Sequence, residues 1–135
     1  MPRSILPLLA ATLCLAVVVG APARAEDKPA HKTIGVEEFE KVAKEPGVVV
    51  LDVRTGTEYR KGHLKDATLI DIQQPKEFEQ KIKALDKSKT YAVYCAIGGR
   101  SAKACKQLDA LGFAKVYNLD GGIKAWEKAG KPVEK

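Results

Sequence analysis

The chain has 135 residues, of which 45% are hydrophobic and 30% are charged. This length corresponds to one domain of roughly 100 to 200 residues, and the composition is too apolar for a chain that is disordered throughout. The formal net charge is +6, but lysines and arginines are scattered among acids without a dense basic stripe, which argues against a nucleic-acid partner.

The first 25 residues have a composition of their own. Arg3 and the amino terminus form a short positive region, an almost wholly apolar stretch follows at residues 5–20, and Ala23-Arg24-Ala25 has small residues at the two positions that a signal peptidase reads. This pattern predicts a cleavable secretory signal peptide at residues 1–25. The protein would then be periplasmic or secreted, with no membrane attachment after cleavage; an uncleaved membrane anchor is the alternative.

The rest of the chain divides into a short polar segment and one domain. Residues 26–31 contain Pro29 and show no periodic pattern, so we expect a flexible tether there. Residues 32–135 alternate short apolar runs with apolar residues at helical spacing, and they contain no internal repeat.

Strands and helices are predicted to alternate along this domain. Val48–Leu51 is a β-branched run typical of a strand that is buried on both faces. In chain order we expect a weak edge strand at 32–34, a helix with Val36, Phe39 and Ala43 on one stripe, strands at 48–51 and 68–70, a helix with Phe78, Ile82 and Leu85, a strand at 91–94, a helix with Ala104 or Cys105, Leu108 and Leu111 that ends at Gly112, a strand at 116–119 and a helix at 123–129. This order predicts an α/β fold with a central, mainly parallel sheet covered by helices on both faces.

Two cysteines, Cys95 and Cys105, follow the predicted signal peptide, which itself contains Cys14. They form no Cys-x-x-Cys pair, and only His31 and His63 are further soft ligands, so no metal site is predicted. Cys105 falls on the buried stripe of its helix, where we expect it one turn below Cys95 and facing away from it. This placement argues against a disulfide between the two.

The segment after the strand at 91–94 has the composition of an anion-binding loop around a sulfur atom. Ligands bind beyond the carboxyl ends of strands in parallel α/β sheets, and Cys95 follows such a strand directly. Glycines allow backbone N–H groups to turn inward, and Ser101 begins a helix whose positive end faces the same place. We expect this helix end and Arg100 to lower the pKa of the Cys95 thiol and to make it a nucleophile. The predicted substrate-binding residues are Ala96, Ile97, Gly98, Gly99, Arg100 and Ser101. The alternative is that Cys95 is only a small buried residue at a strand end.

At these residues the sequence resembles the rhodanese (sulfurtransferase) domains. Their active-site loop begins with the catalytic cysteine and commonly runs Cys-x-x-Gly-x-Arg-Ser, which Cys95, Gly98, Arg100 and Ser101 match. Further stretches are similar to the other signatures of the family, in the same order within residues 33–134: Leu51-Asp52-Val53-Arg54 with Glu58 and Gly62-His63-Leu64, then Leu111-Gly112-Phe113, and finally Leu119–Ile123 with Ala125-Trp126. The resemblance implies a single rhodanese-like domain with three α/β/α layers.

The resemblance also implies an enzyme, a sulfurtransferase in which Cys95 alternates between thiolate and persulfide. The thiolate would take sulfur from thiosulfate, a polysulfide or a persulfide, including one carried by a partner protein, and pass it to cyanide or a thiol. This scheme needs no cofactor and no general base.

Asp52, Arg54 and His63 are the supporting candidates near this site. Arg54 and Glu58 are four residues apart, which is the spacing of an ion pair at the start of a helix, so a structural role is preferred for them. His63 is expected to fix its loop by a hydrogen bond, since a single histidine without an evident partner is more often structural.

The sequence departs from the family pattern in two places. Ala96 and Ile97 stand where family members that act on thiosulfate often carry a basic side chain, which leaves Arg100 as the cation of the loop. A polysulfide or a protein-bound persulfide would therefore suit this loop at least as well as thiosulfate. Lys65-Asp66 replaces a usual Pro-Gly pair, a change expected to alter only a turn.

Two other functions use similar residues. A sulfur carrier or binding module without turnover needs the same cysteine, and only a turnover measurement separates it from an enzyme. Cysteine phosphatases and arsenate reductases have loops that resemble Cys-x5-Arg, whereas Cys95 and Arg100 are separated by four residues. The shorter loop favours sulfur over phosphorus chemistry.

Overall fold

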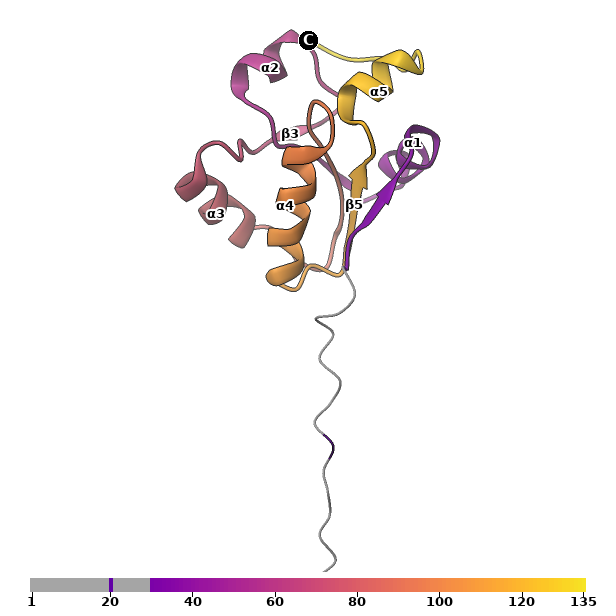
Figure 1. Cartoon of the computed structure of the whole chain (residues 1–135). Coiled ribbons are helices and arrows are strands. Elements are labelled where there is room, and N and C mark those ends of the chain that lie inside the picture. Colours follow the sequence, from indigo (N-terminus) through magenta and orange to yellow (C-terminus); the bar gives the residue numbers. More distant parts are fainter. Residues whose placement is uncertain (1–19, 21–29) are drawn as a thin grey trace, which may run out of the picture.

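The computed structural model describes residue 20 and residues 30–135 (Figure 1). The predicted signal peptide, apart from residue 20, and the predicted tether up to residue 29 lie outside the described residues. In the part of the chain that is described, no helix is long and apolar enough to cross a membrane.

Each predicted strand is present, with ends displaced by at most one residue. In chain order the elements are β1 (Lys32–Ile34), α1 (Val36–Lys44), β2 (Val49–Asp52), α2 (Gly56–Lys61), β3 (Thr68–Leu69), α3 (Pro75–Lys83), β4 (Thr90–Tyr94), α4 (Gly99–Ala110), β5 (Lys115–Leu119) and α5 (Gly122–Lys128). Gly112 has a φ of 84° just beyond α4, where the sequence predicts the helix to stop.

The five strands form one sheet in the order β1-β5-β4-β2-β3, and every pairing is parallel. This confirms the predicted parallel sheet. The interior strand β4 shows why helices must cover both faces, since successive side chains of a strand point to opposite sides. Tyr91 and Val93 pack with α3 and α4, whereas Ala92 and Tyr94 pack with α1 and α5. The domain is therefore a three-layer α/β/α structure.

Helix α2 has no apolar stripe, and none of its residues is buried. It begins with a capping box instead: the Glu58 N–H donates to Thr55 Oγ1 over 3.3 Å, and the Thr55 N–H donates to Glu58 Oε1 over 3.5 Å. The Thr-x-x-Glu spacing is the sequence signal that locates this helix, because its residues show no periodic pattern of apolar side chains.

Lys65-Asp66, the pair that replaces Pro-Gly, occupies a turn before β3. Asp66 has a φ of 58°, in the left-handed region that favours glycine, and it is the one residue other than glycine with a positive φ among those described. Aspartate tolerates this conformation better than most residues, so the turn is retained without the glycine.

A buried polar cluster closes the carboxyl ends of β2 and β4. The Asp52 carboxylate is fully buried, and Arg54 donates to it from Nε to Oδ1 over 2.9 Å and from Nη2 to Oδ2 over 2.6 Å. Arg54 Nη2 also donates to the Gly62 carbonyl over 2.7 Å. The Tyr94 hydroxyl donates to Asp52 Oδ2 over 2.8 Å and accepts from the Leu64 N–H over 3.0 Å. The cluster therefore ties β2, β4 and the segment after α2 together.

The prediction that Arg54 pairs with Glu58 is wrong, because Arg54 pairs with Asp52. A fully buried carboxylate without a partner would cost far more free energy than an exposed helical ion pair provides, so Asp52 takes the guanidinium. Burial and the neighbouring Asp52 charge raise the pKa of Tyr94 well above its usual value. The Tyr94 hydroxyl therefore stays neutral and remains a donor.

We expect Tyr94→Phe to lower the free energy of unfolding by about 1–3 kcal/mol, because it leaves the buried Leu64 N–H without its acceptor and removes a donor from Asp52. Urea denaturation followed by circular dichroism measures this change. Tyr117→Phe is the matched control, since Tyr117 is half-buried and its hydroxyl has no hydrogen bond among the described residues. Equal losses in the two variants would contradict the assigned role.

Candidate active site

The Cys95 thiol lies at the carboxyl end of β4, where the sequence predicts it. Its sulfur atom accepts the Gly98 N–H over 3.0 Å and the Ser101 hydroxyl over 3.3 Å. The hydroxyl proton is shared with the Gly98 carbonyl, 3.1 Å away. The residue is 1% exposed, so protein donors replace most of the water that would solvate a thiolate.

Hydrogen bonds control the ionisation of this thiol. Burial by itself raises the pKa of Cys95, but the Ser101 hydroxyl and the backbone N–H groups of Ser101, Gly98 and Ile97 together outweigh burial and lower the pKa. The predicted direction of the shift is therefore found. The start of the helix lowers the pKa of Cys95 through individual hydrogen-bond donors. These donors contribute more to the shift than Arg100 does.

Helix α5 holds the loop from the opposite side. The Ile123 N–H donates to the Cys95 carbonyl over 2.8 Å, and the Lys124 N–H donates to the Ala96 carbonyl over 3.1 Å. This approach needs Gly122, because a Cβ atom there would lie 2.5 Å from the carbonyl oxygens of Cys95 and Ala96. With the carbonyls held by α5, the N–H groups later in the loop are left to face the sulfur.

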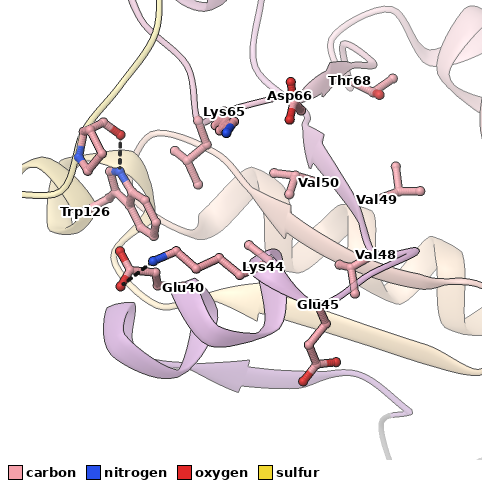
Figure 2. Close-up of a pocket in the computed structure, with 13 residues that line it drawn as sticks. Glu40, Lys44, Glu45, Val48, Val49, Val50, Lys65, Asp66, Thr68 and Trp126 are labelled. Atoms are coloured by element: carbon pink, nitrogen blue, oxygen red, sulfur yellow. Dashed lines mark hydrogen bonds and ion pairs between the residues drawn. The ribbon is translucent and has the colours of Figure 1, made fainter.

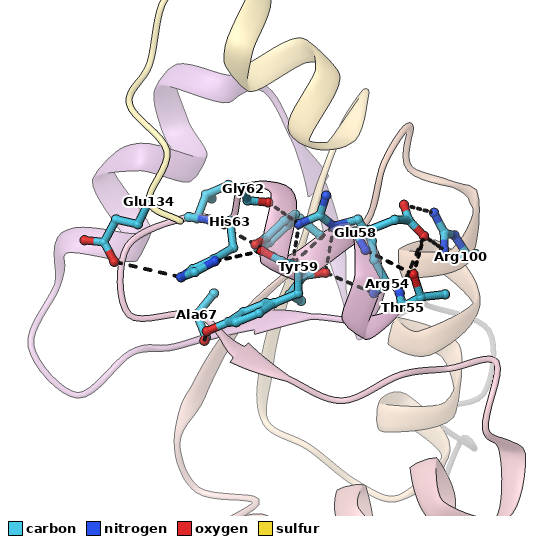
Figure 3. Close-up of polar contacts among 12 residues, drawn as sticks. Arg54, Thr55, Glu58, Tyr59, Gly62, His63, Ala67, Arg100 and Glu134 are labelled. Carbon is cyan, nitrogen blue, oxygen red and sulfur yellow. Dashed lines mark hydrogen bonds and ion pairs between the residues drawn. The ribbon is translucent and has the colours of Figure 1, made fainter.

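Arg100 does not present a free guanidinium to the loop. Its Nη1 donates to Glu58 Oε1 over 2.8 Å and its Nη2 to Glu58 Oε2 over 2.9 Å, so the two side chains form a bidentate pair (Figure 3). The hydrogen bond from Arg100 is the largest influence on Glu58 and lowers the pKa of this carboxyl to about 2. The pair joins the first turn of α2 to the first turn of α4.

Ile97 forms an apolar tip on the loop. Its side chain is 67% exposed, more than any other large hydrophobic residue in residues 30–135. The loop therefore presents an apolar side chain to solvent beside the thiol. Ala96, beside it, is half-buried.

The three supporting candidates have structural contacts. Asp52 and Arg54 belong to the buried cluster beneath the loop, and among the described hydrogen bonds neither touches the Cys95 sulfur. His63 Nδ1 lies 3.0 Å from the Tyr59 carbonyl oxygen, and its ring stacks on the Tyr59 ring at 3.8 Å (Figure 3). These contacts fix the segment after α2, which is the role expected for His63.

Cys105 lies one turn after Ser101 on α4, as predicted, but it does not face away from Cys95. Both residues belong to the hydrophobic core between the sheet, α3 and α4, and both carry free thiols. Burial raises the pKa of Cys105 to about 12. Its thiol is therefore neutral and unreactive at neutral pH.

A cavity lies on the other face of the sheet. It has a volume of about 700 Å³, and its lining includes the apolar residues Val48, Val50 and Leu64. Figure 2 shows Trp126 at one end of it and charged side chains such as Lys44 at its rim. None of its lining residues belongs to the loop at 95–101. The cavity is thus separate from the thiol.

Metal ligands do not gather in the described part of the chain, where no three histidine, cysteine, aspartate or glutamate side chains lie close enough to hold an ion. His31 contacts Asp109 at 2.5 Å, between Nδ1 and Oδ2, and His63 contacts Tyr59.

Two residues of the site carry roles that sequence reasoning missed. Glu58 belongs to a stretch that resembles the family and has the spacing of a pair with Arg54, but its position 42 residues before Arg100 gives no local signal of the pair that forms. Gly122 has a φ of 62°, a conformation that favours glycine, and its contact with the loop depends on β5 lying beside β4.

The chain is similar to known proteins in sequence and fold. The sequence profile of the Rhodanese-like domain matches residues 35–129. A putative sulfurtransferase of Bacillus subtilis is 37% identical over 93 residues, which are 69% of this chain and 86% of that protein. The crystal structure of a rhodanese-related protein from Thermoplasma volcanium superposes with a TM-score of 0.67 at 36% identity and covers 76% of this chain and 97% of that one.

Proteins named tRNA uridine(34) hydroxylase are also similar. The one from Cytophaga hutchinsonii is 38% identical over 111 residues, which are 79% of this chain but 36% of that protein. The chain thus spans about a third of the length of this relative. The similarity says nothing about the remaining two thirds.

We expect Ser101→Ala to slow the reaction of Cys95 with iodoacetamide at pH 7 by about tenfold or more, since a hydrogen bond to a charged group is worth roughly 1.5–3 kcal/mol. Loss of the hydroxyl raises the pKa of Cys95, so the increase of the alkylation rate should occur at higher pH in the variant than in the wild type. The measurement is the alkylation rate against pH in a Cys105→Ser background. Ser88→Ala, in an exposed turn, is the control, and an unchanged profile for Ser101→Ala would exclude the hydroxyl as a donor to the thiolate.

Proposed function

This chain belongs to the rhodanese-like domain family, and we propose that it is a sulfurtransferase that carries sulfur as a persulfide of Cys95. The hydrogen bonding of the Cys95 sulfur is the observation that carries the proposal, because a buried thiol with a lowered pKa and inward-facing N–H donors suits a nucleophile that becomes an anionic persulfide. The relative named as a putative sulfurtransferase, matched over most of its length, supports the same function.

The proposed reaction has two halves. The Cys95 thiolate attacks the outer sulfur of the donor, a new S–S bond forms on Cys95, and the donor's own bond to that sulfur breaks, with its electron pair leaving on the rest of the donor. A thiophilic acceptor, cyanide or a thiolate, then attacks the terminal sulfur of the persulfide, and the electron pair returns to the Cys95 sulfur. The N–H donors that lower the pKa of the thiolate also stabilise the negative terminal sulfur of the persulfide. Neither half requires a base or a cofactor.

The donor proposed is a polysulfide or a persulfide, small or carried by a protein, in preference to thiosulfate. Two observations favour this choice. The loop tip is the exposed, apolar Ile97, and the cation of the loop, Arg100, is already paired with Glu58. Cyanide and thiols are the proposed acceptor classes.

We also propose that residues 1–25 are a cleavable secretory signal and that residues 26–31 are a tether, so that the domain works in the periplasm or outside the cell. The support is the sequence pattern alone: a positive start, an apolar stretch and the Ala-Arg-Ala site.

We expect incubation with inorganic polysulfide to add the mass of one sulfur atom to the wild type and to Cys105→Ser, but not to Cys95→Ser. Later addition of cyanide should remove this mass and release thiocyanate. Intact-protein mass spectrometry with a colorimetric thiocyanate assay measures both halves. Loading without multiple turnovers would identify a sulfur carrier, and failure to load Cys95 from polysulfide, persulfide and thiosulfate would reject sulfur transfer.

Expression of the full chain in a Gram-negative host should place a shortened protein in the periplasmic fraction, because signal peptidase would cut after Ala25. Amino-terminal sequencing should then begin at Glu26. Ala23→Asp and Ala25→Asp together should block cleavage and leave the longer form, whereas a full-length cytoplasmic protein in the wild type would contradict the proposed signal.

A further inference from the structure

We infer that Glu58 is a positioning residue that sets which sulfur donors the site accepts: by holding Arg100, it disfavours the thiosulfate dianion and favours persulfide donors that carry at most one negative charge and an apolar group. This inference rests on the proposed sulfur transfer and concerns the same site.

The first support is the saturation of Arg100. Thiosulfate carries two negative charges, and a site that binds it holds the sulfonate end with charged or hydrogen-bonding donors. Arg100 is the one cationic residue of the segment 95–101, and both of its terminal nitrogens already donate to Glu58, over 2.8 and 2.9 Å. A sulfonate would have to displace a carboxylate that fits the guanidinium in both positions.

The second support is the rigidity of Glu58. The capping box holds its Oε1 against Thr55, with 3.2 Å between this oxygen and Thr55 Oγ1 (Figure 3). Its pKa of about 2 keeps the carboxylate charged at neutral pH. The pair with Arg100 therefore does not open by protonation, and moving Glu58 away would also disturb the start of α2.

The third support is the sum of charges near the sulfur. Arg100 pairs with Glu58, and the pKa of Arg100 is raised first by this hydrogen bond and, more weakly, by the negative charge of Cys95. With Cys95 as a thiolate, these three groups carry a net charge of −1. A dianion approaching the thiolate is repelled, whereas an uncharged donor is not.

The fourth support is the exposed tip at Ile97, which offers an apolar contact to the organic part of a donor R–S–SH. In that reaction the thiolate attacks the sulfur that bears the hydrogen, the S–S bond of the donor breaks, and the electron pair leaves on R–S. The proton passes to this departing sulfur, so that the products are R–SH and the Cys95 persulfide anion. No oxidant or reductant is consumed.

The test compares Glu58→Gln with the wild type, using thiosulfate and ethyl persulfide as donors and mass spectrometry to follow loading of Cys95. Glutamine keeps an acceptor for the capping box and for one Arg100 nitrogen, so α2 should remain folded. Without the negative charge, kcat/KM for thiosulfate should rise about tenfold, mostly through KM, and the gain should shrink as ionic strength increases. The ratio of kcat/KM for thiosulfate to kcat/KM for ethyl persulfide should therefore be higher in Glu58→Gln than in the wild type.

Glu79→Gln is the matched control, because Glu79 is exposed on α3 and pairs with Lys83. Its substitution changes the total charge by the same amount as Glu58→Gln. It should leave the donor ratio unchanged. The double variant Glu58→Gln with Arg100→Gln should lose the gain, since the freed guanidinium causes it. The alkylation profile of Cys95 should also shift to lower pH in Glu58→Gln, which a purely structural role of Glu58 would not produce.

The wild type supplies a second measurement that needs no variant. Sulfate resembles the sulfonate end of thiosulfate in shape and charge, and we expect it not to inhibit loading from ethyl persulfide. Inhibition by sulfate, or an unchanged donor ratio in Glu58→Gln, would overturn the role of Glu58. Failure of the wild type to load from thiosulfate, ethyl persulfide and inorganic polysulfide alike would instead overturn the proposed function itself.

Discussion

The site depends on how the backbone between β4 and α4 is held. The N–H groups of Ile123 and Lys124 bind the carbonyl oxygens of Cys95 and Ala96, and the later N–H groups of the loop face the sulfur. If these carbonyl groups were free, nothing would hold the backbone in the orientation that directs its N–H groups toward the sulfur. The hydrogen bonds on the other side of the loop thus help to position the donors that lower the pKa of the thiol.

The sheet order makes this arrangement available. Because β5 pairs with β4 in parallel, the helix that follows β5 begins beside the loop that follows β4. Gly122 then allows the two backbones to approach, and the buried cluster of Asp52, Arg54 and Tyr94 supports the same edge of the sheet from beneath. Each element is ordinary, and the site results from their placement at one end of parallel strands.

Sequence reasoning finds the parts of this design that local pattern encodes. β-branched runs locate the strands, and a cysteine followed by glycines and Ser101 locates the nucleophile. It fails where partners are chosen by free energy across the fold: Arg54 turns to the buried Asp52, which leaves Glu58 for Arg100, 42 residues away. It also fails to predict α2, because the residues of this helix are exposed or half-buried and form no apolar stripe. Burial, which decides these choices, is not visible in spacing.

Two cysteines in one hydrophobic core show how little of their chemistry comes from the residue type. Cys95 and Cys105 are both almost inaccessible to water, and burial raises the pKa of each. Among the described residues, donors are aimed at the Cys95 sulfur alone of the two, and these reverse the direction of its pKa shift. Cys105, one helical turn past Ser101, belongs to the hydrophobic core. The end of the helix, where N–H groups have no partner within the helix, therefore separates a nucleophile from a packing residue.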